Sequence, residues 1–343
     1  MRVLCYGAGA IGTLVGGYLA RAGNPVALLG RPGHVDAVNR QGLEMRLPGA
    51  PPERVGLQAY SSLVQALGDG FAPELAILTV KGYDTPAAVA DLQAHLPAGT
   101  LVLTLQNGIG NEELLAGALG LDRTLSGCIT LSVGLPEPGC VELFSTKGGI
   151  GLASLDERTS IAPVASLLGQ AGFTVMVQPD WRALKWSKLL LNVLGNAVAA
   201  ILDLAPREVF ADHALCGLER AAFNEALAVM KTWELRPVDL PGFPVRLLVF
   251  LFRSLPPTVL SPLLAGRLGS GRGEKMPSLW LDLRKGRTES EVAQLNGAVA
   301  AWGRKLGLAT PANTRITDAL TDILANPSRQ EKYRHNPAAL LKP

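Results

Sequence analysis

The chain has 343 residues, and at about 150 residues per domain this length predicts two domains. Apolar residues make up 48% of the sequence and charged residues 18%, which excludes a mainly disordered chain. The 32 basic and 29 acidic residues leave a net charge of +3. Because no Lys/Arg-rich block accompanies this small charge, nucleic acid is not expected as a partner.

Cysteine spacing and the apolar runs indicate in which cellular compartment the protein is expected. The four cysteines form no C-x-x-C pair, and the four histidines add no zinc-ligand spacing. We therefore expect reduced thiols, no metal site and a cytoplasmic protein. Glycines interrupt the apolar N-terminal stretch early, so no cleaved signal peptide is expected. The apolar runs 189–205 and 240–265 contain Asn, Arg or Pro residues, so no membrane span is expected either.

Strand and helix patterns alternate in the first half of the chain. Short apolar runs predict strands at Arg2–Tyr6, Pro25–Gly30, Glu74–Val80 and Thr100–Leu105. Helical periodicity follows the first strand as far as Gly23 and returns at Pro86–His95. This alternation predicts an α/β, Rossmann-type domain with a doubly wound parallel sheet. The runs Val141–Ser145 and Gly149–Ala153 predict a hairpin, and Phe173–Val177 a last strand.

After Asp180 the pattern is helical. Periodic runs predict helices at Leu184–Leu204, Ala214–Trp233 and Glu289–Leu306, separated by proline-rich breaks. We therefore predict a nucleotide-binding domain at 1–180 and an all-helical domain at 181–330. The residues from Asn326 onward are polar and bounded by prolines, which predicts a loose tail, assigned to 331–343.

A glycine-rich segment joins the first predicted strand to the first helix. It reads Gly7-Ala8-Gly9-Ala10-Ile11-Gly12 and so matches G-x-G-x-x-G. In a strand–loop–helix context this pattern is typical of a dinucleotide site, where the glycines allow a tight turn, backbone approach to pyrophosphate and close helix packing. A purely structural glycine-rich turn is the alternative.

Arg31 follows the second predicted strand. An NAD-selective site carries Asp or Glu at this position, whereas a guanidinium suits a 2'-phosphate. The residue therefore favours NADP(H) as the cofactor, although a solvated surface arginine would also explain it.

Two polar residues follow the next two predicted strands. Lys81 comes after the strand at Glu74–Val80, and Asn107 after the strand at Thr100–Leu105. Ligands of open α/β sheets bind beyond the carboxyl ends of strands, so both residues are candidates for the site. A solvated strand end and an Asn-Gly turn are the alternatives.

In the helical half, Lys188, Asn192 and Asn196 are spaced i, i+4 and i+8. On one helix they would form a polar stripe within an apolar segment, and buried polar groups need partners. Those partners are either other protein groups or a ligand that carries oxygens.

A third candidate region precedes the helix predicted to end near Leu306. Thr288 and Glu291 match the S/T-x-x-E capping box, so Glu291 could simply cap this helix.

Taken together, these residues resemble the ketopantoate reductases (2-dehydropantoate 2-reductases). The resemblance extends over most of the chain and rests on motifs in the same order and spacing. These are Gly7–Gly12, Arg31, Lys81, Leu105–Glu112, Lys185–Leu189 with Asn192 and Asn196, Leu295-Asn296-Gly297 and Thr310–Asn313.

The resemblance implies a Rossmann domain followed by a helical domain like that of 6-phosphogluconate dehydrogenases, with the active site in the cleft between them. It implies that Lys188 gives a proton to the substrate oxygen and that Asn192 and Asn196 bind substrate. Asn107 would then lie near both nicotinamide and substrate. The family's cleft carboxylate matches Glu291 when counted back from the Asn-Gly pair, and Glu289 remains the alternative.

The chain departs from the family pattern in two places. The segment that helps to grip the substrate carboxylate retains only Ser278 and Asp282 of the family's Ser-Ser-Met-x-Gln-Asp, which leaves the substrate open. The apolar segment 235–275 is longer than in the family, and its exposed part would suit a subunit contact in a homodimer.

We therefore expect an NADPH-dependent reductase that converts a small 2-oxo acid to a 2-hydroxy acid. The first candidate substrate is 2-dehydropantoate, whose reduction belongs to pantothenate biosynthesis and the coenzyme A pathway. The alternatives are a reductase of another 2-oxo acid or of an imine, and a non-catalytic NADP(H) sensor.

Overall fold

The computed structural model describes residues 1–156, 158–271 and 276–342, and the chain divides into two compact units. The first unit comprises Met1–Gln106, Gly110–Lys185 and Leu240–Phe243. The second comprises Asn107–Ile109, Trp186–Asp239 and Pro244–Pro343. Two short segments therefore belong, by their contacts, to a different unit from their neighbours in the sequence.

Within the described residues, the first unit is built on an eight-stranded sheet in the order β12-β11-β8-β7-β6-β1-β2-β5. Its strands are β1 (Val3–Tyr6), β2 (Val26–Leu29), β5 (Gln58–Tyr60), β6 (Leu75–Leu78), β7 (Leu101–Thr104), β8 (Thr124–Ile129), β11 (Ile150–Ser154) and β12 (Val175–Val177). From β5 to β8 all neighbouring strands are parallel, and β11 runs antiparallel to β8. The parallel, doubly wound sheet predicted from the sequence is confirmed.

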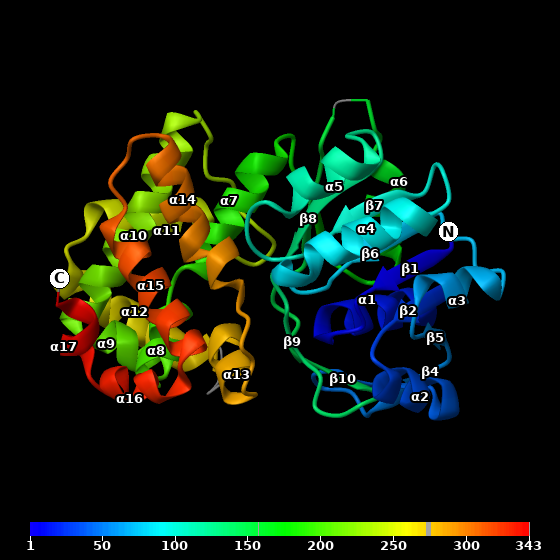
Figure 1. Ribbon diagram of the computed structural model, residues 1–343, viewed down its shortest axis with the longest axis horizontal. Helices are drawn as coiled ribbons and strands as arrows, with labels where there is room; N and C mark the ends of the chain where they lie inside the picture. The colour runs from blue at the N-terminus through cyan, green and yellow to red at the C-terminus, as the bar shows by residue number, and fades with distance from the viewer. Residues whose placement is uncertain (157, 272–275, 343) are drawn as a thin grey trace. The chain divides into compact units, whose positions relative to one another are not determined.

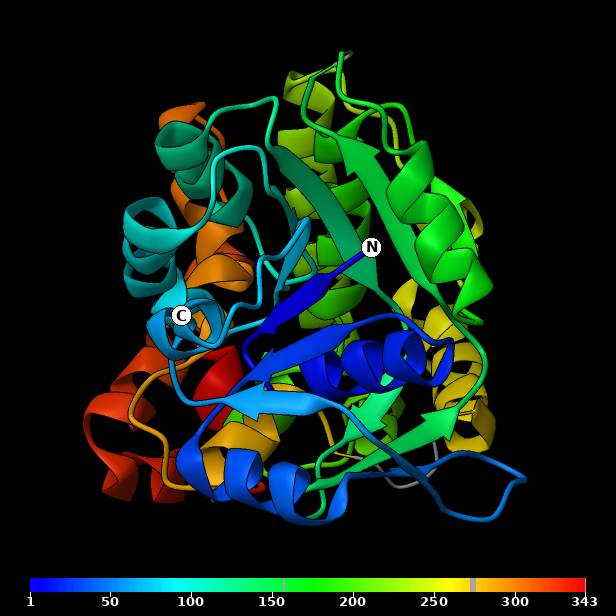
Figure 2. The same ribbon diagram turned by 90° about the vertical axis from the view of Figure 1, so that its right-hand side faces the viewer.

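Helices cover both faces of this sheet because its strands alternate their side chains between two cores. Leu4 packs into one core, whereas Val3 and Cys5 pack into the other; fully burying such a side chain contributes about 1.5 to 3 kcal/mol. The first face carries α3 (Leu63–Gly68), α4 (Thr85–His95) and α5 (Asn111–Leu119), of which α4 and α5 lie in front in Figure 1. The other carries α1 (Ala10–Arg21), α2 (Pro32–Gln41) and α6 (Ala162–Gln170), and Figure 2 shows α1 in dark blue.

A smaller sheet corrects the predicted hairpin. It has the order β4-β3-β10-β9, with β3 (Leu43–Arg46), β4 (Glu53–Val55), β9 (Ser132–Gly134) and β10 (Cys140–Ser145). Strand β10 pairs with β3 and β9, whereas β11 belongs to the large sheet. The predicted hairpin is therefore wrong. The link between the two strands packs on the end of β8 instead, where the Gly149 N–H donates to the Thr130 hydroxyl over 2.9 Å.

The elements that follow Asp180 are helices, as predicted. They are α7 (Trp181–Asn192), α8 (Ala197–Leu202), α9 (Pro206–Ala211), α10 (His213–Thr232), α11 (Val245–Ser254), α12 (Pro257–Gly271), α13 (Ser278–Arg284), the 3-10 helix η2 (Glu291–Gln294), α14 (Asn296–Lys305), α15 (Pro311–Ala325), the 3-10 helix η3 (Pro327–Arg329), α16 (Gln330–Tyr333) and α17 (Pro337–Leu341). Helix α10 is the centre of this unit and packs against α9, α11, α12, α14, α15 and α17. Asp212 caps it by accepting from two backbone N–H groups of the first turn.

Two predicted helices and the predicted tail need correction. The helix predicted at Leu184–Leu204 breaks after Asn192 and restarts at Ala197, and the one at Glu289–Leu306 consists of η2 and α14. The predicted loose tail is wrong, because α17 buries Leu340 and its Leu341 carbonyl accepts from Arg315 over 2.8 Å.

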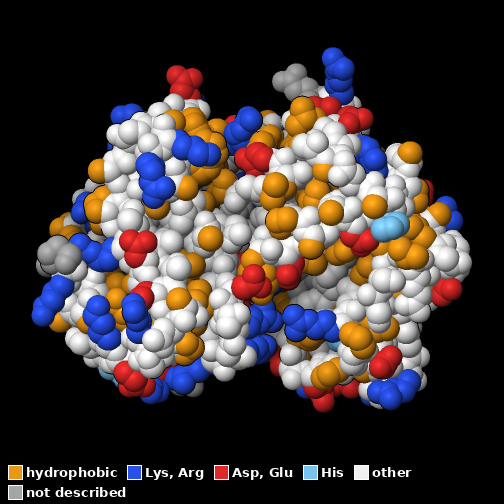
Figure 3. All heavy atoms as spheres, in the orientation of Figure 1, with side chains coloured by type: hydrophobic (Ala, Val, Ile, Leu, Met, Phe, Trp, Pro, Cys, Tyr) orange, Lys and Arg blue, Asp and Glu red, His pale blue; other side chains and the backbone are white. Residues whose placement is uncertain are grey.

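The cysteines, the charged surface and the apolar helices bear on the expectations from composition. All four cysteines are buried thiols. On the face drawn in Figure 3, Lys and Arg side chains occur in small groups among Asp and Glu. None of the helices in the described ranges is long and apolar enough to cross a membrane.

Candidate functional site

The glycine-rich segment forms the turn between β1 and α1. Gly7 has φ +108°, and a Cβ there would lie 2.7 Å from the Val80 nitrogen. A Cβ on Gly12 would lie 2.3 Å from the Gly7 oxygen, so only glycine allows α1 to pack this closely. At Gly9, by contrast, no described heavy atom lies within 4 Å of a Cβ. The loop therefore has an open side at Gly9 next to the first N–H groups of a helix, which are the groups that bind phosphate in proteins.

Arg31 lies at the same edge of the sheet. It is the exposed N-cap residue of α2 and follows the last residues of β2. A Cβ on the preceding Gly30 would lie 2.8 Å from the Cβ of Ala8, so the end of β2 adjoins the glycine-rich loop. Arg31 therefore begins α2 close to the glycine-rich loop.

Lys81 and Gln106 mark the ends of β6 and β7. Lys81 is the half-buried N-cap residue of the 3-10 helix η1 (Gly82–Asp84). The Gln106 amide nitrogen donates to the Val80 carbonyl over 2.9 Å and to the Thr85 hydroxyl over 2.8 Å. The side chain of Gln106 therefore ties the two strand ends together beside Lys81.

A buried ion pair lies behind these strand ends, and sequence reasoning gave it no role. Lys185 Nζ lies 2.9 Å from Glu112 Oε1, and both side chains are 1% exposed. Lys185 also donates to the Gln106 carbonyl over 2.5 Å, and the Ser126 hydroxyl donates to Glu112 over 2.9 Å. The one sequence feature that could have indicated this ion pair is the position of Lys185 among the apolar residues of a predicted helix. The pair anchors the first turns of α7 to the backbone just before Asn107.

Asn107 belongs to the helical unit and connects two of the predicted site regions there. The Asn192 side-chain nitrogen donates to Asn107 Oδ1 over 3.2 Å. The Ile109 N–H donates to the Gln294 carbonyl over 3.0 Å, and Gly108, at φ +85°, leaves no room for a side chain against Gln294. Asn107 is thereby held between the end of α7 and η2.

The predicted polar stripe of Lys188, Asn192 and Asn196 on one helix is wrong, because the helix breaks after Asn192. Lys188 and Asn192 lie one turn apart on α7, and both are half-buried. Asn196 is not on that helix, because it is the N-cap residue of α8. Its side-chain oxygen accepts from the Leu279 N–H over 3.2 Å, at the start of α13, where Ser278 is exposed. The structure therefore joins Asn192 to Asn107, and Asn196 to the segment that contains Ser278.

Glu291 is the first residue of η2 and is 3% exposed, whereas Glu289 is exposed. The predicted capping box at Thr288 is wrong, since the Ser290 hydroxyl caps this helix by accepting from the Val292 N–H over 3.2 Å. Glu291 is the buried one of the two candidate carboxylates, on the same short helix as Gln294.

The altered segment that contains Ser278 and Asp282 has a structural explanation. The Trp280 indole N–H donates to Asp203 over 2.7 Å, and Arg284 and Arg334 donate to the same carboxylate. These donors hold the pKa of Asp203 below its usual value against the effect of its partial burial. The tryptophan therefore fastens α13 to the end of α8.

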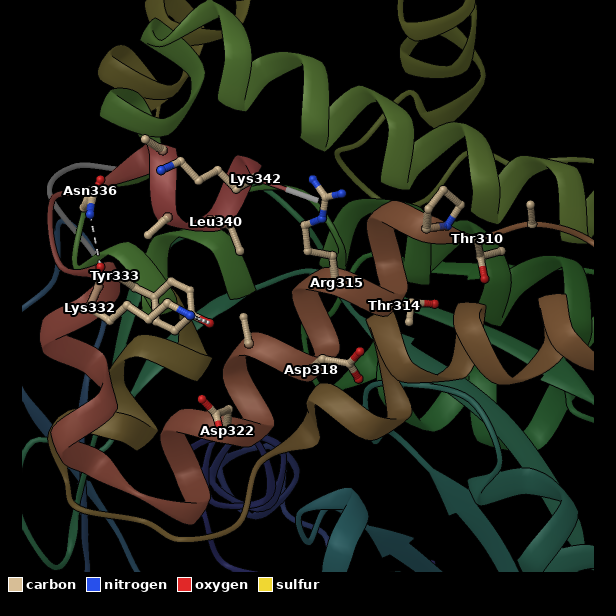
Figure 4. Close-up of a pocket in the computed structure, with 15 residues that line it drawn as sticks. Thr310, Thr314, Arg315, Asp318, Asp322, Lys332, Tyr333, Asn336, Leu340 and Lys342 are labelled. Carbon is tan, nitrogen blue, oxygen red and sulfur yellow. Dashed lines mark hydrogen bonds between the residues drawn. The ribbon is translucent and has the colours of Figure 1, made fainter.

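A separate hollow of ≈ 1020 Å³ lies between α15 and the C-terminal helices. Figure 4 shows Arg315, Asp318 and Asp322 of α15 along one side of it, and Lys332 and Lys342 along the other. Basic and acidic side chains are mixed there, and none of the predicted site residues contributes to the lining. Across the described chain, no three His, Cys, Asp or Glu side chains gather as a metal site would require.

Comparison with known proteins identifies relatives of both units. The family model "Ketopantoate reductase PanE/ApbA" matches residues 3–157, and the model of that family's C-terminal part matches residues 180–323. The 2-dehydropantoate 2-reductase of Pyrococcus horikoshii is 36% identical over 206 residues, covering 60% of this chain and 65% of the relative. That of Pyrococcus abyssi is 27% identical over 319 residues, covering 91% and 94%. The crystal structure of a PanE/ApbA family ketopantoate reductase from Ralstonia eutropha has a TM-score of 0.80 at 28% identity and covers 96% of this chain and 100% of that one.

Proposed function

Because this chain belongs to the ketopantoate reductase family, we propose that it reduces 2-dehydropantoate to pantoate with NADPH. The observation that supports this most directly is the hydrogen bond between Asn192 and Asn107, with Lys188 one turn earlier on α7. Lys188 and Asn192 are half-buried on α7, where polar side chains are costly unless they have partners, and a substrate that carries oxygens would provide such partners. The family activity is that of an oxidoreductase acting on a small molecule.

A nicotinamide dinucleotide is the cofactor, and we propose the phosphorylated form. The open backbone at Gly9 and the helix start behind it suit the pyrophosphate. Arg31 would pair with the 2'-phosphate, and Lys81 lies at the neighbouring strand end. When bound, the reduced nicotinamide supplies the hydride for the keto carbon.

Lys188 would act as the general acid. Hydride addition to a carbonyl places negative charge on the oxygen, and a proton from the Lys188 ammonium neutralises it as it forms. Asn192, oriented by its bond to Asn107, would donate to the substrate, and Asn196 and Ser278 would contact its distal end. After turnover Lys188 would take up a proton from solvent, and the Glu291 carboxylate would hold the regenerated ammonium in place.

The test of the function is consumption of NADPH with 2-dehydropantoate, pyruvate and 2-oxoisovalerate as separate substrates. We expect 2-dehydropantoate to give the highest kcat/KM. A higher kcat/KM with another keto acid would identify that acid as the better substrate. No turnover with any of the three would favour a non-catalytic NADP(H)-binding protein. Lys188→Met should lower kcat by about 10² to 10⁴ with NADPH affinity retained, and Lys188→Arg should restore little, since arginine does not readily give up a proton.

The cofactor is tested at Arg31. Arg31→Ala should weaken NADPH by about 1.5 to 3 kcal/mol, the contribution of a charge-assisted hydrogen bond, and leave NADH binding unchanged. Fluorescence titration with each cofactor measures both affinities. Equal weakening of the two would assign Arg31 a structural role and remove the preference for NADP(H).

We also propose that the apolar face of α11 and α12 is a contact in a homodimer. Phe250 is 62% exposed and Leu247 45%, and Val259 and Leu263 of α12 are exposed as well. Large exposed apolar side chains of this kind are typical of association surfaces. Sedimentation of wild type and Phe250→Glu would test this: a dimer that dissociates on substitution supports it, and a monomeric wild type rejects it.

A further inference from the structure

The break between α7 and α8 departs from the periodicity of the sequence. Apolar residues continue at helical spacing from Leu184 to Leu204, yet residues 193–196 are not helical. Gly195 has φ +61°, a conformation that side chains rarely adopt. A Cβ there would lie 2.9 Å from Phe210. The break therefore has a definite geometry, and it lies between the two asparagines assigned to the substrate.

One buried carboxyl group contacts this break. Glu219, on α10, is fully buried, and its Oε2 accepts from the Gly195 N–H over 3.0 Å. Its Oε1 has no hydrogen-bond partner in the described part of the chain. Burial raises the pKa of Glu219 to about 8. A carboxyl group placed at such a cost is unexpected in an apolar core unless its position matters.

We propose that Glu219 is a positioning residue for the substrate amides. By holding the Gly195 N–H, it fixes the turn that ends α7 at Asn192 and starts α8 at Asn196. Asn192 then bonds to Asn107, and Asn196 to the first turn of α13. Without the acceptor, the Gly195 N–H would be buried and unpaired, and the turn would relax toward a geometry that satisfies it. The inference rests on the proposed function, because it assumes that these amides bind the keto acid.

The experiment compares Glu219→Gln with Glu219→Met. Glutamine keeps an oxygen that can accept from Gly195, whereas methionine fills the space without a comparable acceptor. Glu219→Met should raise the KM for the keto acid about tenfold or more and leave NADPH affinity within about twofold. Glu219→Gln should stay within about twofold of wild type in both. Val229→Ala, which removes buried apolar atoms from the same helix, is the control for general destabilisation and should not change the KM.

A structural readout separates this inference from the proposed function. Hydrogen–deuterium exchange of a peptide covering residues 189–199 should be slow in wild type and Glu219→Gln and fast in Glu219→Met. If wild type reduces no keto acid, the proposed function fails while the exchange result still decides whether Glu219 holds the break. Equal KM values for wild type and Glu219→Met, or equal impairment of both variants, would overturn the proposal. Should Glu219→Met not fold, Glu219→Asp, which withdraws the acceptor by one methylene, must raise the KM above that of Glu219→Gln or the proposal is rejected.

Discussion

The two units each bury a carboxyl group near the candidate site, and they compensate it differently. In the sheet unit, Glu112 lies 2.9 Å from the Lys185 ammonium and accepts from the Ser126 hydroxyl. In the helical unit, Glu219 accepts from one donor among the described residues, the Gly195 N–H, and burial raises its pKa to about 8. Each group retains one oxygen without a hydrogen-bond partner among the described residues.

The comparison shows how partner chemistry decides the state of a buried acid. A cation at contact distance favours the charged carboxylate, because Coulomb attraction offsets much of the lost hydration. A single amide N–H offsets less, so the neutral acid is favoured around pH 7. We therefore expect Glu112 to contribute through an ion pair and Glu219 through a hydrogen bond that the neutral form also accepts.

Breaking the ion pair should have the largest effect on stability. Lys185→Met leaves Glu112 without its cation in the core, and we expect a loss of about 3 to 5 kcal/mol in the free energy of unfolding. The Gln106 carbonyl also loses its 2.5 Å donor. Urea denaturation of wild type and variant measures the loss.

The double variant Lys185→Met, Glu112→Gln tests the cause. Glutamine removes the charge and still accepts from Ser126, so the double variant should be more stable than Lys185→Met alone by about 1 kcal/mol or more. If the two losses simply add, the pair contributes packing and no charge compensation, and the contrast with Glu219 disappears.

The second largest effect that we expect is a pH dependence of the unfolding free energy that comes from Glu219. Its pKa is raised from 4.5 to about 8 in the folded protein, so the folded state binds the proton more tightly than the unfolded state. Its contribution is therefore fully present below pH 4.5 and is lost as pH rises to about 8, with a slope of up to about 1.4 kcal/mol per pH unit.

Glu219→Gln is the matched control, since it cannot titrate. The difference in unfolding free energy between wild type and Glu219→Gln should fall with rising pH across this window and stay flat above it. A difference that does not change with pH would mean that Glu219 keeps an ordinary pKa, and a difference that rises would mean that its carboxylate form is the stabilised one.

The sequence predicts some strands of the fold and misses others. Apolar periodicity located β1, β2, β6 and β7, because each is a short continuous apolar run between glycines, prolines or polar residues. It missed β8, which contains Ser126 and Gly127 within a fully buried strand. It also joined β10 and β11 into a hairpin, because pairing between distant strands leaves no local pattern.

For the candidate site, the residue types were predictable and their relations were not. A strand end predicts Asn107 and helical spacing predicts Asn192 as site residues, but their hydrogen bond joins positions 85 residues apart. The stripe failed at Asn196 because a glycine conformation and the Glu219 carboxyl group end the helix, and periodicity reports neither. No sequence pattern predicts that Lys185 pairs with Glu112, since a buried ion pair depends on two distant segments meeting.

The smallest expected effect concerns the glycine that Glu219 contacts. Gly195→Ala forces an L-residue into φ +61° and brings a Cβ to 2.9 Å from Phe210, for which we expect a loss of about 1 to 2 kcal/mol. Gly217→Ala, on α10, provides the contrast, because no described heavy atom lies within 4 Å of its Cβ and a helical alanine gains about 0.5 to 1 kcal/mol over glycine. Thermal unfolding of both variants measures the difference. If Gly195→Ala is as stable as Gly217→Ala, the turn tolerates a side chain, and the geometry of the break must come from the Glu219 hydrogen bond alone.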